Sequence, residues 1–200
     1  MTSAMRASSP VPEPPLRVAL IIGSTREGRV CDVIGDWFAE RARRRAGIAL
    51  EVLDLARYRF PDRYPRRPTE PMRRFAAGIG RAEAFVIVTP EYNRSFPAAL
   101  KQAIDYAYDE WHAKPVGFVS YGCGSDGVYA VEQLRAVFTE LHVVTVRSRV
   151  GVDLLGPQVD RAGRPRDTDE QTRAVTALLD QLVWWGLTLR DGRAARPYVS

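Results

Sequence analysis

The stretch LIIGSTREGRV, residues 20–30, decides the fold, because an apolar run ends at Gly23 in a loop of small and positively charged residues. An amphipathic helix pattern follows at once, with apolar residues at helical spacing from Val30 to Phe38. A strand that turns through such a loop into a helix directs unpaired backbone N–H groups and the helix dipole at one point. Phosphate is the usual occupant of that point. The stretch therefore predicts a site for a phosphorylated small molecule.

Four side chains of this loop can add to such a site. Arg26 and Arg29 can donate charge-assisted hydrogen bonds to phosphate oxygens, and Ser24 and Thr25 can donate from their hydroxyls. The alternative interpretation is an ordinary strand-to-helix turn whose arginines are solvated.

Three kinds of phosphate loop compete for this stretch. Gly23 and Gly28 have the spacing of the G-x-x-x-x-G-K-[ST] loop, but Arg29 replaces its lysine and Val30 replaces its hydroxyl. The usual magnesium ligand is then missing, which argues against nucleotide hydrolysis. The G-x-G-x-x-G dinucleotide fingerprint also fails, because only two of its glycines are present. A mononucleotide phosphate loop of the flavodoxin type remains.

Length and composition predict one domain. The chain has 200 residues, and we expect a disordered Pro-, Ser- and Ala-rich lead-in over residues 1–15, a domain over residues 16–189 and a loose tail over residues 190–200. The lead-in has no apolar h-region, and no run of about 18 apolar residues suggests a membrane span. Cys31 and Cys123 are far apart and have no histidine cluster beside them. We therefore expect a cytoplasmic protein without disulfides or a metal site.

The net charge of +5 comes almost entirely from arginine, since Lys101 and Lys114 are the two lysines. A basic chain can bind nucleic acid. The arginines are scattered, however, and no helix-turn-helix or RNA-binding signature accompanies them, so we expect no nucleic-acid partner.

Strand-like and helix-like segments alternate along the chain, which predicts a parallel sheet covered on both faces. The five expected strands span residues 16–22, 49–53, 84–89, 116–121 and 143–152. Residues 54–71, rich in proline and arginine, are expected to form a long ordered loop. Ligands of such folds lie beyond the carboxyl ends of the strands, so the loops at those ends are the places to seek a site.

The loop after the third expected strand reads TPEYNRSFP, residues 89–97. Between its prolines lie an acid, an aromatic and an amide, and Tyr92 can cover a planar heteroaromatic ring. The alternative is a proline-bounded loop in which Asn93 or Ser95 caps the next helix.

The loop after the fourth expected strand reads SYGCGSDG, residues 120–127, and its three glycines allow a backbone to approach a ligand closely. The alternative is a flexible turn into a helix capped by Ser125 or Asp126. We interpret Cys123 as a small packing or ring-contact residue, because no His or Asn partner is near it in sequence. In a sheet of order 2-1-3-4-5 the three loops are neighbours. One loop suits a phosphate and two suit a planar ring, a division that matches FMN.

From residue 16 to residue 187 the chain resembles the NADPH-dependent FMN reductases, which include azoreductase-like and chromate or quinone reductase-like flavoproteins. The resemblance rests on GSTREGRV, on TPEYN with FPAALKQAIDY, and on SYGCGSDG. It implies a flavodoxin-like three-layer α/β/α sandwich with a five-stranded parallel sheet of order 2-1-3-4-5. It also implies bound FMN, NADPH or NADH as co-substrate, and a homodimer or homotetramer.

Carried over by position, the resemblance implies three groups of cofactor-binding residues. The first, with Thr25 added from the same loop, would hold the phosphate, the second would line the flavin ring, and the third would contact its other edge. They are Ser24, Thr25, Arg26, Arg29 and Val30; Pro90, Glu91, Tyr92 and Asn93; and Tyr121, Gly122, Cys123 and Gly124. Arg29 stands where many relatives carry serine, and Arg94 and Asp126 also depart from the common pattern. No catalytic side chain is expected, because the flavin itself carries the hydride chemistry.

The predicted function is an NAD(P)H-dependent oxidoreductase that transfers hydride through FMN to a small acceptor. Quinones, azo and nitro compounds, metal oxyanions and free flavin are all open as acceptors. Two alternatives are a flavin reductase that supplies reduced FMN to a partner monooxygenase and a flavodoxin-like electron carrier without NAD(P)H turnover. The aromatic-rich segment from Arg94 to Trp111 is expected at an oligomer interface; alternatively, its aromatics pack beneath the last helix.

Overall fold

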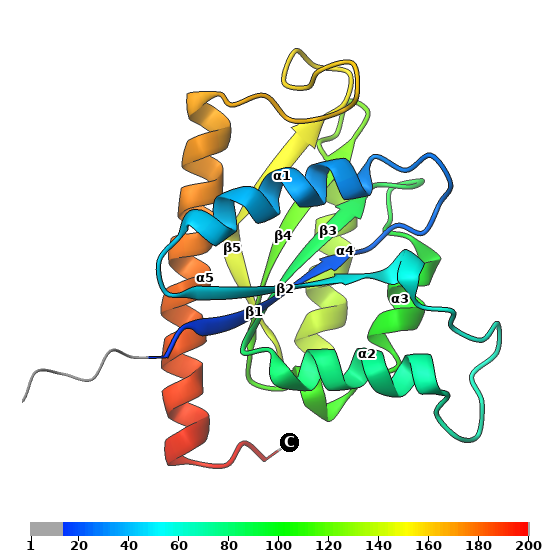
Figure 1. The fold of residues 1–200 in the computed structure, drawn as a ribbon, viewed down its shortest axis with the longest axis vertical. Helices are drawn as coiled ribbons and strands as arrows, with labels where there is room; N and C mark the ends of the chain where they lie inside the picture. Colours follow the sequence, from blue (N-terminus) through cyan, green and yellow to red (C-terminus); the bar gives the residue numbers. More distant parts are fainter. Residues whose placement is uncertain (1–13, 200) are drawn as a thin grey trace, which may run out of the picture.

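The computed structural model describes residues 14–199, so nearly all of the predicted lead-in over residues 1–15 lies outside the described residues. Five parallel strands form one sheet of order β2-β1-β3-β4-β5 (Figure 1). The predicted strand order is confirmed. The strands are β1 (Leu16–Ile22), β2 (Ile48–Asp54), β3 (Ala84–Pro90), β4 (Pro115–Gly122) and β5 (Val144–Asp153).

Helices cover both faces of this sheet and make three layers (Figure 1). The helices are α1 (Cys31–Arg44), α2 (Glu70–Arg81), α3 (Ala98–Ile104), α4 (Val128–Glu140) and α5 (Asp169–Ala195). Successive side chains of a strand point to opposite faces. Leu20 therefore packs with Trp37 on the side of α1 and α5, whereas Ile21 packs with Ile104 on the side of α2, α3 and α4.

The strand register brings the carboxyl ends of four strands to one edge of the sheet. Ile22, the last residue of β1, pairs with Asp54 of β2 and with Val88 of β3. Pro90 of β3 pairs in turn with Tyr121 of β4. The loops after β1, β3 and β4 therefore leave the sheet side by side, and β2 ends directly beside them.

The loop between β2 and α2 is ordered by aromatic packing. A short 3₁₀ turn, Leu55–Arg57, starts it. The rings of Tyr58 and Phe60 stack at 5.5 Å, and both make edge contacts with Phe75 of α2. The Tyr106 hydroxyl donates a hydrogen bond to the carbonyl of Pro61. This loop is therefore fastened to α2 and to the segment after α3.

The expectation of a loose tail from residue 190 is wrong for residues 190–195, because α5 continues to Ala195. Two arginines hold this last part of the helix. The Arg190 guanidinium donates to the carbonyl of Pro14, and that of Arg193 donates to the carbonyl of Ala113. Residues 190–195 have no apolar stripe. Hydrophobic periodicity therefore cannot predict this part of the helix, which polar contacts hold in place.

The aromatic-rich segment after β3 does not pack as one of its two expected arrangements required. Its helix α3 ends at Ile104, and Trp111 is fully buried on the ring of Phe85 with centroids 4.6 Å apart. These residues belong to the sheet face opposite α5, so they do not pack beneath the last helix. Of the aromatics in this segment, Tyr108 is exposed. The expectation of an oligomer interface at this segment stays a prediction, and Tyr108 is the aromatic side chain that it leaves exposed.

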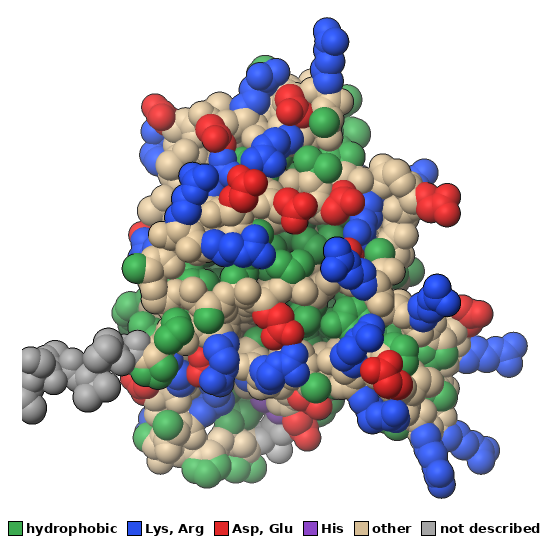
Figure 2. All heavy atoms as spheres, viewed as in Figure 1, with side chains coloured by type: hydrophobic (Ala, Val, Ile, Leu, Met, Phe, Trp, Pro, Cys, Tyr) green, Lys and Arg blue, Asp and Glu red, His purple; other side chains and the backbone are tan. Residues whose placement is uncertain are grey.

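Within residues 14–199 no helix is long and apolar enough to cross a membrane. Figure 2 shows basic side chains lying next to acidic ones over much of the face in view. The arginine-rich composition is therefore visible on that face as interleaved charge.

Candidate functional site

The loop between β1 and α1 is anchored at its start and open in its middle. The backbone N–H of Gly23 donates to the carbonyl of Val88 at 2.8 Å, and Ser24 is fully buried. Residues 25–28 are exposed. The Ser24 hydroxyl lies 3.1 Å from the hydroxyl of Tyr92, in the loop after β3. The first and second predicted loops are therefore in direct contact.

The open part of this loop has the donor set that an anion needs. Across residues 14–199, no acceptor takes the backbone N–H groups of Thr25, Glu27 or Gly28. Gly28 has a φ of 65° and would gain no contact within 4 Å from a Cβ. These N–H groups lie in the loop that leads into α1, whose N-terminus carries the positive end of the helix dipole. The geometry fits a phosphate group.

The two arginines of the loop differ in their surroundings. Arg26 is exposed, and its guanidinium carbon lies 5.9 Å from the centroid of the Tyr92 ring. The Arg29 side chain is only 11% exposed and donates to both carboxylate oxygens of Asp54 at 2.7 Å. Arg26 is free to meet a ligand, whereas Arg29 is held by the end of β2. Val30 is half-buried as the N-cap residue of α1.

The loop after β3 is a tight hairpin. Tyr92 and Ser95 exchange backbone hydrogen bonds of 2.8 and 2.9 Å across Asn93 and Arg94. Both central residues have positive φ, 51° and 62°, which is the geometry of a type I′ turn. Asparagine accepts this conformation readily, but glycine is the usual second residue. The Arg94 guanidinium lies 4.3 Å from the ring centroid of Tyr129, at the start of α4.

Glu91 lies at the site but its carboxylate has a structural partner. One oxygen accepts a 3.0 Å hydrogen bond from the backbone N–H of Tyr129, in the first turn of α4. The positive end of the α4 helix dipole also stabilises a negative charge at this position. Pro90 is buried as the last residue of β3. In the part of the chain that the structure describes, the N–H groups of Asn93 and Arg94 have no acceptor, so this hairpin can donate to the edge of a polar ring.

The loop after β4 is shaped by two glycines with positive φ and by two carboxylates. Gly124 has a φ of 82° and donates its N–H to Asp153 at 2.8 Å. Gly127 has a φ of 80°, and a Cβ there would lie 2.6 Å from the Cβ of Ser120. Asp126 forms a bidentate ion pair of 2.9 Å with Arg149 of β5. This loop borders a hollow of about 450 Å³ that also touches Tyr129.

The residues of the third predicted group differ in burial. Tyr121 is buried on the α1 side of the sheet, and burial raises the pKa of its phenol above the ordinary value. Cys123 is exposed. Cys31 is fully buried and its thiol lies 3.4 Å from the carbonyl of Val88; burial raises the pKa of this thiol to about 11. Gly122 accepts a backbone hydrogen bond from Leu154. Tyr121 therefore supports the floor of the site, while Cys123 and Gly124 face outward.

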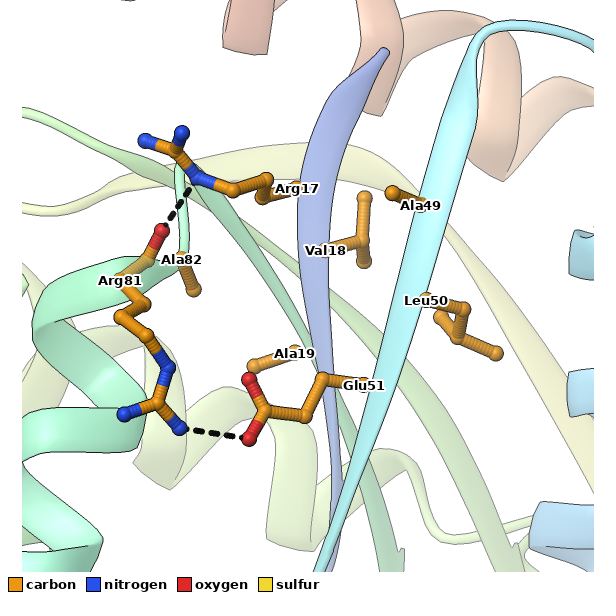
Figure 3. Close-up of a pocket in the computed structure, with 8 residues that line it drawn as sticks. All are labelled: Arg17, Val18, Ala19, Ala49, Leu50, Glu51, Arg81 and Ala82. Atoms are coloured by element: carbon orange, nitrogen blue, oxygen red, sulfur yellow. Dashed lines mark hydrogen bonds and ion pairs between the residues drawn. The ribbon is translucent and has the colours of Figure 1, made fainter.

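Another hollow lies away from this edge. A groove of about 220 Å³ crosses the early residues of β1, the middle of β2 and the end of α2. Figure 3 shows the Arg81 guanidinium meeting the Glu51 carboxylate at this groove, at 2.7 Å. The lining residues include none of the three loops, so the groove is not part of the candidate site.

Sequence reasoning did not find Asp54, Tyr129, Arg149 or Asp153, although each contacts one of the three loops. One sequence signal pointed to Asp54. It is the last residue of β2, so it stands at the carboxyl end of a strand that lies next to β1 in the sheet. The other three lie on α4 and β5, and only the folded chain brings them to the site.

Comparison with known proteins agrees with this geometry. The family model of the NADPH-dependent FMN reductases matches residues 16–154. An NAD(P)H-dependent FMN reductase of Schizosaccharomyces pombe is 34% identical over 133 residues, which are 60% of this chain and 64% of that protein. A quinone reductase of Pseudomonas putida is 35% identical over 116 residues, covering 55% of this chain and 62% of that protein. The match thus spans just under two thirds of either relative.

Among solved structures, the flavoenzyme NAD(P)H:(acceptor) oxidoreductase FerB of Paracoccus denitrificans superposes with a TM-score of 0.72 at 21% identity, covering 86% of this chain and 98% of that one. A flavodoxin of Streptococcus pneumoniae superposes with a TM-score of 0.56 at 14% identity, covering 84% and 98%. These likenesses show a flavodoxin-like fold. Since the family model matches 16–154 of the 200 residues, the chain belongs to the NADPH-dependent FMN reductase family.

Proposed function

We propose that the chain binds FMN at the carboxyl edge of its sheet and is an NAD(P)H-dependent oxidoreductase for a small electron acceptor. The observation that carries this proposal is the contact between the loops after β1 and β3, where the hydroxyls of Ser24 and Tyr92 lie 3.1 Å apart. One loop offers free N–H groups for a phosphate, and the other offers them beside an aromatic ring. Membership of the FMN reductase family supports the same conclusion.

In this proposal the residues of the chain bind and orient FMN. The N–H groups of Thr25, Glu27 and Gly28, with Ser24 and Arg26, would hold the FMN phosphate. The hairpin at Tyr92 and the glycine loop after β4 would hold the ring. When bound, FMN supplies the redox chemistry, taking a hydride from NAD(P)H and passing two electrons to the acceptor. No side chain of the site is assigned a proton-transfer role.

The acceptor and the assembly are part of the proposal. A quinone is favoured as acceptor, because quinone reductases from Pseudomonas putida and a 2-hydroxy-1,4-benzoquinone reductase from a Burkholderia species are among the relatives. We propose a homodimer or homotetramer in the cytoplasm. Among the exposed large hydrophobic side chains, Leu155 and Trp184 are 75% and 60% exposed, and burial of such side chains would favour association. No nucleic-acid partner is proposed.

The purified protein tests the flavin proposal directly. We expect a yellow protein, or one that takes up about one equivalent of FMN per chain, as one flavodoxin-like site requires. A colourless protein that leaves added FMN unquenched in a fluorescence titration would overturn the proposal.

Anaerobic mixing with NADPH or NADH then separates the possible activities. A reductase bleaches its flavin quickly, whereas an electron carrier does not. Gel filtration after reduction shows whether FMN stays on the protein. Retained flavin with rapid quinone turnover supports the proposed enzyme, and released flavin supports the alternative of a reductase that supplies a partner monooxygenase.

A further inference from the structure

The Arg29 guanidinium makes three hydrogen bonds within the protein. Its Nη1 atom donates to the backbone carbonyl of Ser24 at 2.5 Å and to Asp54 at 2.7 Å. Its Nη2 atom donates to the other Asp54 oxygen at 2.7 Å, and its Nε atom lies 3.7 Å from Asp32. A guanidinium has five N–H donors. Two of the five make no hydrogen bond, and one of these two, on Nε, faces Asp32; the side chain is only 11% exposed.

The Asp54 carboxylate also accepts hydrogen bonds within the protein. Besides Arg29, its carboxylate accepts a hydrogen bond of 3.1 Å from the backbone N–H of Ala56, which caps the 3₁₀ turn after β2. Burial alone would raise the pKa of the Asp54 carboxyl, but the hydrogen bonds from Arg29 and Ala56 outweigh it and lower that pKa. The side chain is 13% exposed. The pair is therefore a charged, bidentate contact at the rim of the core.

This pair connects both ends of the phosphate loop to a third segment. Arg29 lies at the end of the loop, and the Ser24 carbonyl that it binds lies at the start. Asp54 belongs to β2, whose last residue pairs with the last residue of β1. The loop is thus closed across its base and fixed to the sheet. The Ser24 hydroxyl, on the same residue, reaches Tyr92 in the next loop.

We propose that Asp54 and Arg29 are positioning residues, which hold the phosphate loop in its binding shape and leave Arg26 as the loop arginine that meets the phosphate. This inference rests on the proposed binding of FMN. A bidentate arginine–carboxylate pair has strict planar geometry, so it can define the path of a short loop. The competing possibility is that Arg29 leaves Asp54 and contacts the phosphate itself.

The variant Asp54→Asn separates these two roles, because they predict effects of opposite sign. If Arg29 positions the loop, loss of the pair loosens the loop and FMN binds more weakly. If Arg29 is a phosphate ligand restrained by Asp54, the variant frees a cation near the phosphate and FMN binds more tightly. The same variant also removes a negative charge, which by itself would favour a phosphate.

The matched control for that charge is Asp32→Asn. Asp32 lies 3.7 Å from the same guanidinium, but its side chain is 49% exposed and makes no bidentate contact. Removal of either carboxylate changes the net charge equally. A difference between the two variants therefore reports the contacts of Asp54, which are the pair with Arg29, the Ala56 N–H and the Arg57 guanidinium at 3.5 Å; Arg29→Lys then isolates the pair.

Fluorescence titration of each protein with FMN and with riboflavin is the experiment. Riboflavin lacks the phosphate, so a loop effect appears as lost selectivity for FMN, whereas damage to the ring site weakens both ligands. We expect Asp54→Asn to weaken FMN binding by about tenfold or more, with riboflavin binding changed less than about threefold. Asp32→Asn is expected to leave both affinities within about threefold. Unchanged or tighter FMN binding by Asp54→Asn would overturn the inference.

A second variant, Arg29→Lys, covers the case in which Asp54→Asn does not fold. Lysine keeps the charge and can still reach a phosphate, but it cannot make the bidentate contact or bind the Ser24 carbonyl at the same time. We expect the same loss of FMN selectivity. Unfolding of both variants in circular dichroism would assign the pair to the fold and overturn the inference. A wild-type protein that binds neither flavin would instead overturn the proposed function on which the inference rests.

Discussion

The hydroxyl oxygens of Ser24 and Tyr92 lie 3.1 Å apart and join two loops whose contact residues are 68 positions apart in sequence. Ser24 is fully buried, so this contact is a fixed part of the site. It connects the loop expected to hold a phosphate with the hairpin expected to line a ring. The guanidinium of the exposed Arg26 lies 5.9 Å from the centroid of the same Tyr92 ring, so a cation lies beside both loops.

Arg26→Ala is predicted to weaken FMN binding by about 1.5 to 3 kcal/mol, the range for a hydrogen bond to a charged group. Hydride transfer in flavin-saturated protein should change little, because Arg26 binds and does not react. Titration with FMN and a stopped-flow reductive half-reaction measure the two effects. The control is Arg43→Ala, an exposed arginine in the last turn of α1 with the same charge change. Equal FMN affinity in both variants would remove Arg26 from the phosphate site.

Cys123→Ser is predicted to keep most NAD(P)H-dependent activity. Cys123 is exposed, and the other cysteine, Cys31, is buried with a thiol pKa raised to about 11. Within residues 14–199 the Cys123 thiol forms no disulfide and no hydrogen bond, so no group in contact with it would activate a thiolate. Steady-state assays with a quinone and an azo acceptor provide the test. A loss of kcat beyond about a hundredfold with flavin bound, roughly 2.7 kcal/mol, would show that the thiol takes part.

Gly127→Ala is predicted to cost far more stability than Gly124→Ala, although both glycines have φ near 80°. At Gly124 a Cβ meets nothing within 4 Å, so the cost is the left-handed strain alone, about 1 to 2 kcal/mol. At Gly127 a Cβ would lie 2.7 Å from the backbone nitrogen of Tyr121, and rigid overpacking adds about 1 to 3 kcal/mol. Urea denaturation compares the two variants. Similar losses would mean that the loop after β4 can shift away from the sheet.

The Asp54–Arg29 pair is predicted to contribute stability that depends on acid pH. The folded-state pKa of Asp54 lies below its ordinary value of 3.8. The folded protein therefore binds fewer protons than the unfolded chain near that pH, and stability rises with pH there. The stability difference between wild type and Asp54→Asn should be constant above about pH 5 and shrink as pH falls below 4. Thermal melting at several pH values measures it, and a difference that grows in acid would contradict the sign.

Lys114→Met is predicted to change the pH dependence of stability in the alkaline range. Lys114 is buried, and desolvation, followed by the charge of Arg193, lowers its pKa from 10.5 to about 8. Below about pH 8 Lys114 is charged in both the folded and the unfolded state. Between about pH 8 and pH 10.5 the unfolded chain keeps a proton that the folded protein has lost, so wild-type stability rises with pH through that range. Relative to the methionine variant, the wild type should gain about 2 kcal/mol between pH 7 and pH 10. A pH-independent difference in denaturant unfolding would show that Lys114 titrates normally.

The layout of the fold was predictable from local patterns. A fully apolar run such as residues 84–88 is typical of a strand buried on both faces, and the spacing from Val30 to Phe38 is that of a helix with one buried face. The glycine and proline punctuation at Gly23, Pro90 and Gly122 marked the strand ends. These signals are local, and they imply a parallel sheet because helices alternate with strands. The same logic failed at Arg190, where polar contacts extend a helix without a periodic stripe.

The order of amino acids was enough to place Ser24, Arg26 and Arg29 in one loop between a strand and a helix, and to show the resemblance to a flavin-binding family. The contacts of each side chain in that loop depend on the folded sheet. Asp54 lies 25 positions after Arg29 in sequence. The two side chains meet because parallel pairing puts the last residues of β1 and β2 side by side. Periodicity reports which face of an element is buried, but not which distant charge lies across from it. The folded sheet is therefore what makes Arg29 a held arginine and leaves Arg26 exposed.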